Sequence, residues 1–338
     1  MGRRYNMKQW ISQLLHAEKK TALPILAFPG AALMGISVKE LVCNSELQAE
    51  GMEMIAKRTK AAASVSFMDL SVEAECFGAA VRFSDHEVPA VTGRLIHDMN
   101  EAQMLKIPDT GGARTGIYLD AVAKAVRRIK DRPVLAGMIG PYSLAARLLD
   151  VTQIMMDCYD DPDMVHLVLE KVTAFLIAYA KAYKASGAHG IMMAEPVAGL
   201  LSPKLEARFS APYVKQIVDA VQDDSFIVIY HNCGDNTPVQ LPSILSTGAA
   251  AYHFGNRVDL RAMLEKIPSH IPVMGNLDPA GVLRFGTPLD VQTETRTLLE
   301  NCGSYGNFVV SSGCDIPPLT PWENVEAFFA AVEEYYAN

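Results

Sequence analysis

The sequence has little that would place it in a membrane or on nucleic acid. Its longest apolar runs fall well short of the roughly 18 residues that suggest a membrane span. No apolar core follows the basic residues at the start, so we expect no signal peptide. Lysine and arginine total 30 against 38 aspartates and glutamates, which gives a net charge of −8, and the sequence has no basic stripe. We therefore expect no membrane and no nucleic-acid partner.

Cysteine is also scarce, and its spacing is irregular. A disulfide framework in a small secreted domain would need regularly spaced pairs. The six cysteines stand at positions 43, 76, 158, 233, 302 and 314. In a chain of 338 residues without a signal peptide, we expect them to be the reduced thiols of a cytoplasmic protein, with some available to bind a metal.

Apolar residues make up 50% of the sequence, which is enough for one large domain or two smaller ones. From residue 133 onward, continuous apolar runs alternate with helical patterns. Such runs are typical of parallel strands buried on both faces. With two earlier runs, the predicted strands cover 24–28, 62–67, 133–139, 189–194, 226–230, 249–254, 271–274 and 307–310.

Because the strand count approaches eight, we predict an α/β fold, a (β/α)8 TIM barrel, in place of an open doubly wound sheet. The glycines after the first run lack the pattern G-x-G-x-x-G, which weakens a dinucleotide-binding interpretation. Helices are predicted over 7–20, 38–59 with a break near residue 44, 142–157, 161–186, 203–222, 239–246, 258–267, 288–301 and 320–336. We expect a single domain over 1–338, with an N-terminal helical extension over 1–23. Residues 80–119 are expected to form an irregular insertion with a hairpin, as in lids and substrate-contacting segments.

Several polar residues stand just after the predicted strands. They are Asp69, Glu195, His231, Cys233, Asn276, Asp278 and Cys314. In a barrel the carboxyl ends of all strands meet on one face, where active sites form. We therefore expect His231 and Cys314 to be neighbours despite their distance in the sequence.

His231, Cys233 and Cys314 are the expected metal ligands. Thiolate sulfur and imidazole nitrogen are good zinc ligands, and three protein ligands leave a fourth tetrahedral position open, as in catalytic zinc sites. His231 and Cys233 are two residues apart on one strand end, so both side chains can point the same way. Gly234 and Gly313 permit close approach to a ligand. The alternative is that the cysteines are small buried apolar residues and that His231 is a hydrogen-bonded core histidine.

A zinc centre with two thiolates and one neutral histidine carries no net charge and is a modest Lewis acid. It suits the binding of a thiol, whose pKa it lowers so that the thiolate can act as a nucleophile. Hydrolytic zinc sites more often use histidine and carboxylate ligands. The pattern therefore favours alkyl transfer to sulfur over hydrolysis.

Five further residues are candidates. Glu195 and Asp69 are the catalytic ones: Glu195 can take the thiol proton, contact substrate or fill the fourth zinc position, while a salt-bridged rim residue is an equal alternative for each. Asn276, Asp278 and His253 are candidate substrate-binding residues. Local sequence favours Asp278 as the N-cap of a helix beginning near residue 279. A core histidine is the alternative for His253.

Five segments resemble the uroporphyrinogen decarboxylase superfamily. They are residues 68–75 (MDLSVEAE), 140–145 (GPYSLA), 231–235 (HNCGD), 274–279 (MGNLDP) and 312–318 (SGCDIPP). More narrowly, they resemble its zinc-dependent methylcobamide:thiol methyltransferase branch, typified by methylcobamide:coenzyme M methyltransferases. His-x-Cys with the late cysteine is the specific part, whereas Gly-Asn-Leu-Asp-Pro is shared more widely across the superfamily.

The resemblance implies a (β/α)8 barrel with one Zn²⁺ at His231, Cys233 and Cys314. It also implies a methylcobamide as methyl donor, carried by a separate small corrinoid protein. A thiol such as coenzyme M, activated on zinc, would accept the methyl group and leave cob(I)amide. The acceptor stays open between coenzyme M, another thiol and tetrahydrofolate.

Two alternatives remain open. The decarboxylase branch of the superfamily uses an arginine-bearing N-terminal segment, and it carries histidine where Cys314 stands. Residues 26–34 contain no arginine, which speaks against decarboxylation, although Asp69 matches an aspartate with which decarboxylases hold pyrrole nitrogens. The other alternative is a non-catalytic barrel that binds a corrinoid or a metal.

Overall fold

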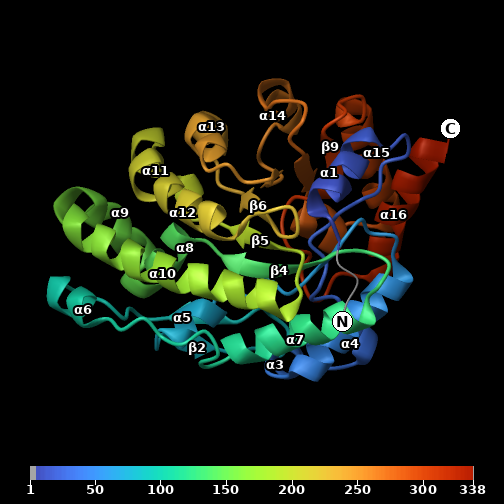
Figure 1. Cartoon of the computed structure of the whole chain (residues 1–338). Helices are drawn as coiled ribbons and strands as arrows, with labels where there is room; N and C mark the ends of the chain where they lie inside the picture. The colour runs from blue at the N-terminus through green and yellow to red at the C-terminus, as the bar shows by residue number, and fades with distance from the viewer. Residues whose placement is uncertain (1–4, 338) are drawn as a thin grey trace.

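The computed structural model describes residues 5–337, so residues 1–4 of the expected N-terminal extension lie outside the described residues. The described chain has an α/β fold around a curled sheet of seven parallel strands (Figure 1). The strands adjoin one another in the order β1 (Ser64–Val65), β4 (Val134–Ile139), β5 (Gly190–Ala194), β6 (Ile227–Asn232), β7 (Ala251–Phe254), β8 (Val273–Leu277) and β9 (Phe308–Ser312). Strands β4, β5 and β6 are buried at every position, as predicted for parallel strands covered on both faces.

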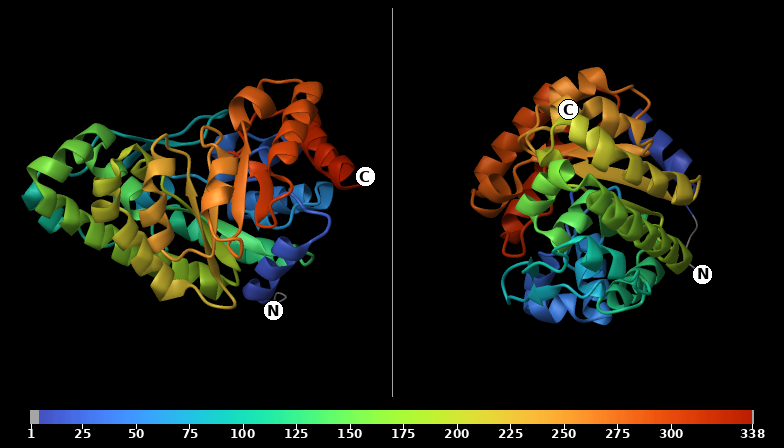
Figure 2. Two further views of the ribbon diagram at one scale, coloured as in Figure 1. Left: turned by 90° about the horizontal axis from the view of Figure 1, so that it is seen from above. Right: turned by 90° about the vertical axis from the view of Figure 1, so that its left-hand side faces the viewer.

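Helices follow most strands and surround the sheet, as the two views of Figure 2 show. The helices are α1 (Met7–His16), α2 (Gly30–Met34), α3 (Val38–Val42), α4 (Ser45–Arg58), α5 (Val72–Cys76), α6 (Met99–Met104), α7 (Thr115–Arg128), α8 (Pro141–Leu149), α9 (Val151–Asp160), α10 (Pro162–Ser186), η1 (Ala198–Leu200), α11 (Pro203–Phe209), α12 (Ala211–Val221), α13 (Thr237–Ser246), α14 (Leu260–Lys266), η2 (Pro279–Arg284), α15 (Pro288–Cys302) and α16 (Trp322–Ala337). Among the described residues, no helix is both long and apolar enough to cross a membrane.

The closed barrel of eight strands is not confirmed, because the predicted first strand over 24–28 does not form one. Pro24 lacks the N–H that a strand would contribute to the ladder. The segment still contacts both edges of the sheet. Leu23 N donates to Val310 O of β9 at 2.9 Å, and Ala62 N, just before β1, donates to Ala22 O at 2.8 Å.

Two predicted helices are each divided in two. The helix expected over 142–157 breaks at Asp150, whose φ is 76° and whose carboxylate accepts from the backbone N–H groups of Thr152 and Gln153 in α9. The helix expected over 203–222 breaks at Ser210, because Pro212 has no N–H to donate and instead occupies the first turn of α12.

The segment 80–119 contains the expected hairpin, in which β2 (Ala80–Arg82) pairs antiparallel with β3 (Ala90–Thr92). It is less irregular than predicted, because α6 and the first turn of α7 also lie in it. Asp98 begins α6 by accepting a hydrogen bond from Glu101 N at 2.9 Å.

Helix α1 packs against the amino-terminal ends of the strands. Met7 N donates to Asp224 O before β6, and Trp10 Nε1 donates to Ala62 O before β1. Both side chains join a core cluster that contains inward residues of the sheet such as Ile229 and Met274. The candidate residues lie on the opposite side of the sheet, at the carboxyl ends of the strands.

Candidate metal centre

Three candidate residues come together at the carboxyl ends of β6 and β9. His231 lies in β6, Cys233 directly follows this strand, and Cys314 stands two residues after β9. Their ligand atoms all lie within 4.8 Å of one another, and Cys314 Sγ is 3.6 Å from His231 Nε2. His231 is 2% exposed, and both cysteines are half-buried and free of disulfides. Among residues 5–337, this is the only group of three or more metal-ligating side chains with such close ligand atoms.

The spacing of these atoms fits a zinc ion. Tetrahedral zinc, with bonds of about 2.3 Å to sulfur and about 2.05 Å to nitrogen, separates these two ligand atoms by about 3.6 Å. The distance between Cys314 Sγ and His231 Nε2 agrees with this value. One imidazole and two thiols are also a donor set that suits zinc chemically. The residues present therefore fit zinc with one ligand position left for another molecule.

The two thiols influence each other. A hydrogen bond from Cys314 lowers the pKa of Cys233. The same bond, together with burial, raises the pKa of Cys314. Cys233 therefore ionises first, and the Cys314 thiol donates its hydrogen to it.

Gly255, at the end of β7, allows the backbone to approach Cys233 closely. A Cβ atom at position 255 would lie 2.5 Å from Cys233 Cβ, a distance that real side chains do not show. Gly234 also packs closely, because a Cβ atom at this position would meet the backbone of Gly199. Only glycine fits at such positions, so the loop after β7 fixes the place of one thiol.

His253 supports His231 from behind. Its Nδ1 lies 2.8 Å from His231 Nδ1, and its Nε2 lies 2.9 Å from Ser311 Oγ. Burial lowers the pKa of His253 well below its usual value, and the adjacent His231 lowers it further. Both ring nitrogens have protein partners, which leaves neither free for the substrate contact that the sequence led us to expect.

Glu195 lies outside the cluster, at the amino terminus of α8. Its two carboxylate oxygens accept hydrogen bonds from Tyr142 N at 2.8 Å, Ser143 N at 2.9 Å and Ser143 Oγ at 2.7 Å. The residue is fully buried, and this burial raises the pKa of Glu195 to about 7 against the opposing hydrogen bonds. These contacts make Glu195 an anchor for the start of α8, where a negative charge is favourable.

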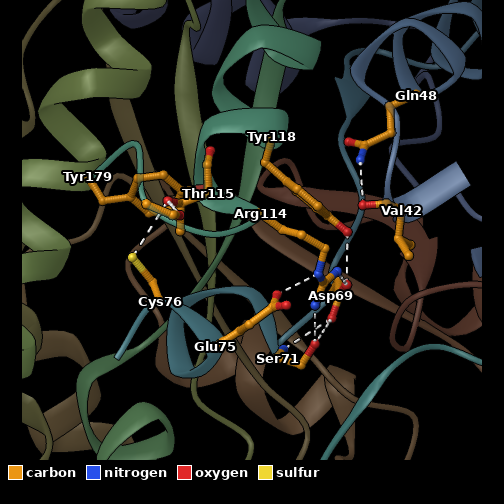
Figure 3. Close-up of polar contacts among 11 residues, drawn as sticks. Val42, Gln48, Asp69, Ser71, Glu75, Cys76, Arg114, Thr115, Tyr118 and Tyr179 are labelled. Atoms are coloured by element: carbon orange, nitrogen blue, oxygen red, sulfur yellow. Dashed lines mark hydrogen bonds and ion pairs between the residues drawn. The ribbon is translucent and has the colours of Figure 1, made fainter. Parts of the chain in front are cut away.

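Asp69 also lies outside the cluster, in the buried network that Figure 3 shows. Its carboxylate accepts from Arg114 Nη1 at 2.5 Å, Tyr118 Oη at 2.9 Å and Ser71 Oγ at 2.6 Å. Arg114 also pairs with Glu75. Asp69 therefore forms a salt bridge, as in the alternative considered for it, but the pair with Arg114 is buried and not at an exposed rim. Sequence reasoning missed Arg114, because nothing near residue 114 in the sequence indicates a partner 45 residues away.

Asn276 and Asp278 both contact backbone. Asn276 Nδ2 donates to Gly255 O at 3.0 Å and to Val258 O at 2.7 Å, so it holds the loop that packs on Cys233. Asp278 accepts from the backbone N–H groups of residues 280 and 281, as expected for the N-cap of η2. Both residues shape the rim of the site.

A cavity of about 190 Å³ lies between the segment after β1, the β2–β3 hairpin and α8. Met68, Leu70 and Ser71 line it together with Arg147 of α8. Arg147 is half-buried, and this burial lowers its pKa. No ion pair or hydrogen bond joins its guanidinium to another described residue. Sequence reasoning overlooked Arg147, although it is the one charged residue in the run 141–149.

A family model described as "Uroporphyrinogen decarboxylase (URO-D)" matches residues 24–335. Methylcobamide:CoM methyltransferase MtbA of Methanosarcina mazei is 30% identical over 271 residues, which cover 79% of this chain and 78% of that protein. A uroporphyrinogen decarboxylase of Methylobacillus flagellatus is 28% identical over 308 residues, 88% of this chain and 85% of its own. A solved methyltransferase structure from Methanosarcina mazei matches 98% of this chain and 99% of its own, with a TM-score of 0.85 at 24% identity, and shows that the fold is shared.

Proposed function

The chain belongs to the uroporphyrinogen decarboxylase family, and we propose that it is a methyltransferase that moves a methyl group from a methylcobamide to a thiol. Sequence identity alone does not distinguish methyl transfer from decarboxylation, because the methyltransferase relative is 30% identical and the decarboxylase relative is 28% identical. The observation that carries the proposal is the cluster of one imidazole and two thiols within 4.8 Å.

We infer that His231 Nε2 and the sulfurs of Cys233 and Cys314 hold Zn²⁺. Zinc bound there would act as a Lewis acid that lowers the pKa of an incoming thiol and holds it as the thiolate. The chain supplies the rest: two thiolates offset the charge of the metal, and Gly255 with Asn276 fixes the loop against Cys233. Burial of His231 limits competition from water.

The methyl donor in this proposal is a methylcobamide presented by a small corrinoid protein. The methyl group would pass from cobalt to the thiol sulfur, with the electrons of the broken bond left on cobalt and the thiol proton released to solvent. Helix α1 packs on the amino-terminal ends of the strands. The carboxyl ends, where the metal ligands lie, are therefore the approach that we propose for the donor. The name of the Methanosarcina mazei relative, a methylcobamide:CoM methyltransferase, supports this class of donor.

The cavity at Arg147 supports an acceptor with an anionic group, such as coenzyme M. A half-buried guanidinium without a protein partner is costly unless an anion pairs with it. The cavity volume of about 190 Å³ suits a small molecule. Its lining residues Met68, Leu70 and Ser71 follow β1, on the side of the sheet where the carboxyl ends of the strands and the metal ligands lie.

Two expectations about the chain as a whole belong to the proposal. Residues 22–25 hydrogen-bond to both sheet edges, and we infer that they complete a (β/α)8 barrel in a single domain. The chemistry needs reduced thiols, which the cytoplasm maintains, so we place the protein there.

Decarboxylation is the less favoured activity. Residues 26–34 offer no arginine to a carboxylate-rich substrate, and Cys314 stands where the decarboxylases carry histidine. Asp69, the residue that matched theirs, is committed to Arg114 in a buried ion pair and is not free to hold pyrrole nitrogens.

Incubation of the zinc-loaded protein with methylcobalamin and a panel of thiols under anaerobic conditions tests the function. We expect loss of methylcobalamin absorbance and a methylated thiol by mass spectrometry. Cys314→Ala should abolish the reaction, whereas Cys302→Ala, which changes a buried cysteine outside the cluster, should retain it. Zinc binding without transfer to any thiol, even with a corrinoid partner protein, would favour the non-catalytic binding role.

A comparison of two thiols tests the cavity. Arg147→Ala should raise the KM for 2-mercaptoethanesulfonate by about 10–100-fold, the loss expected for a charge-assisted hydrogen bond, and should leave that for 2-mercaptoethanol unchanged. Arg257→Ala is the control, since Arg257 is exposed on the loop after β7. Equal effects on both thiols would contradict an anion-binding role.

A further inference from the structure

A chain of buried hydrogen bonds runs from a backbone carbonyl to the proposed metal ligand. Ser311 Oγ donates to Leu23 O at 2.7 Å. Next, Ser311 Oγ lies 2.9 Å from His253 Nε2, and His253 Nδ1 lies 2.8 Å from His231 Nδ1. The last atom of this hydrogen-bonded series, His231 Nε2, faces Cys314 Sγ at 3.6 Å. Every side chain in the series is at most 2% exposed.

The direction of the bonds follows from their first member. A carbonyl oxygen can only accept, so the single hydroxyl hydrogen of Ser311 points at Leu23 O. Ser311 Oγ can then only accept from His253, and His253 Nε2 must carry the hydrogen. A neutral imidazole has one N–H, which leaves His253 Nδ1 as an acceptor. His231 Nδ1 must therefore be the donor, and His231 Nε2 is left with a free lone pair.

We propose that Ser311 and His253 are positioning residues that fix the tautomer of His231, so that its Nε2 is ready to bind a metal before any metal arrives. The inference deepens the proposed function and rests on its metal site. The other nitrogen of a histidine ligand commonly sets its tautomer and orientation, usually through a carboxylate or a carbonyl. Here the acceptor is a neutral imidazole, and this arrangement adds no negative charge behind a site that already has two thiols.

The anchor of the series lies outside the seven-stranded sheet. Leu23 belongs to the extended segment that hydrogen-bonds to β9, and Ser311 lies in β9 itself. Ser311 therefore links the segment over 22–25 to the metal site. The neighbouring Ser312 makes a different contact, because its Oγ accepts from Ile25 N at 3.1 Å and does not join the series.

The tautomer can be observed directly in the metal-free wild-type protein. Two-bond ¹⁵N–¹H correlation spectra of the histidine-labelled protein distinguish a protonated ring nitrogen from a bare one. We expect His231 to carry its hydrogen on Nδ1 and His253 to carry its hydrogen on Nε2. A hydrogen on His231 Nε2 would overturn the proposal. Because the measurement uses the wild type, it does not depend on the folding of any variant.

Two pairs of matched variants add an independent readout. Zinc affinity by chelator competition should fall about 10–100-fold in His253→Leu, the range seen when such supporting contacts are lost. The asparagine of His253→Asn has nearly the same shape as that leucine, but it offers an amide oxygen to His231 Nδ1–H. This variant should therefore recover most of the zinc affinity. Ser311→Ala should populate the wrong His231 tautomer in the ¹⁵N spectra, and Ser312→Ala should not.

The outcomes separate this inference from the proposed function. The expected tautomers and zinc affinities without methyl transfer would refute the function and leave the inference intact. Equal zinc affinities of the wild type, His253→Leu and His253→Asn would overturn the inference even if the wild type transfers methyl groups. Absence of zinc binding by the wild type would remove the metal site on which both depend.

Discussion

Substitution of Glu73 by glutamine tests a buried carboxyl group beside the Asp69 network. Glu73 is 2% exposed, and its Oε1 accepts from Ile139 N at 3.2 Å. Its Oε2 has no hydrogen-bond partner among the described residues. Burial raises the pKa of Glu73 from 4.5 to about 8, although backbone hydrogen bonds oppose the shift. Between pH 4.5 and about 8, Glu73 therefore keeps its proton in the folded protein and loses it in the unfolded chain.

The sign of the effect on stability follows from linkage. Between pH 4.5 and about 8 the folded state binds one more proton than the unfolded state at Glu73. The free energy of unfolding must therefore fall as pH rises through this window, by up to about 1.4 kcal/mol per pH unit. Over the whole window the loss is on the order of 3–5 kcal/mol. A glutamine is neutral at every pH and avoids this loss.

Thermal unfolding midpoints of the wild type and Glu73→Gln, measured from pH 5 to pH 8, provide the assay. The advantage of the variant should grow steadily with pH. Glu300→Gln, which changes an exposed carboxylate, is the control and should follow the wild type. Parallel curves for the wild type and Glu73→Gln would refute the reasoning, because they would mean that Glu73 is ionised in the folded protein at these pH values.

Three further predictions concern the site and its surroundings. Asp69→Asn should lower the free energy of unfolding in denaturant by about 3–5 kcal/mol, because it breaks the buried ion pair with Arg114 and leaves only the more exposed Glu75 to compensate that charge. Gly255→Ala should weaken zinc binding about 10-fold or more in chelator competition, because the new Cβ displaces Cys233. Thiol binding to the zinc-loaded protein near pH 7 should release about one proton, which calorimetry in buffers of different ionisation enthalpy detects.

Each of the two substitutions has its own control. Asp85→Asn changes an exposed aspartate and should leave unfolding unchanged. Gly111→Ala places its Cβ in open space and should leave zinc affinity unchanged. An Asp69→Asn variant as stable as the wild type would contradict the buried ion pair, and tight zinc binding by Gly255→Ala would contradict the steric reasoning. A heat of thiol binding that is independent of buffer would contradict thiolate formation.

The sequence predicted the strands from β4 to β9 well, because strands buried on both faces are continuous apolar runs. It failed at residues 24–28, where an apolar run contains Pro24 and cannot pair along its whole length. Asp150 and Ser210 divide helices whose apolar period continues across the break. In each case a single backbone feature outweighs a pattern that extends over many residues.

The gathering of His231, Cys233 and Cys314 followed from their places at strand ends, since these ends meet at one edge of the sheet. The partners of Asp69 and Glu195 did not follow. Arg114 and the amino terminus of α8 reach these carboxylates through the packing of distant segments, which no local pattern encodes.

X-ray absorption at the zinc edge, with and without a bound thiol, tests whether His231, Cys233 and Cys314 form a zinc centre that binds a thiol. We expect two sulfur ligands and one imidazole around zinc in the free protein, with a light atom in the open position. Addition of 2-mercaptoethanesulfonate should increase the sulfur count to three. An unchanged sulfur count on saturation with thiol, or a shell of nitrogen and oxygen alone, would contradict a thiol-activating centre at His231, Cys233 and Cys314.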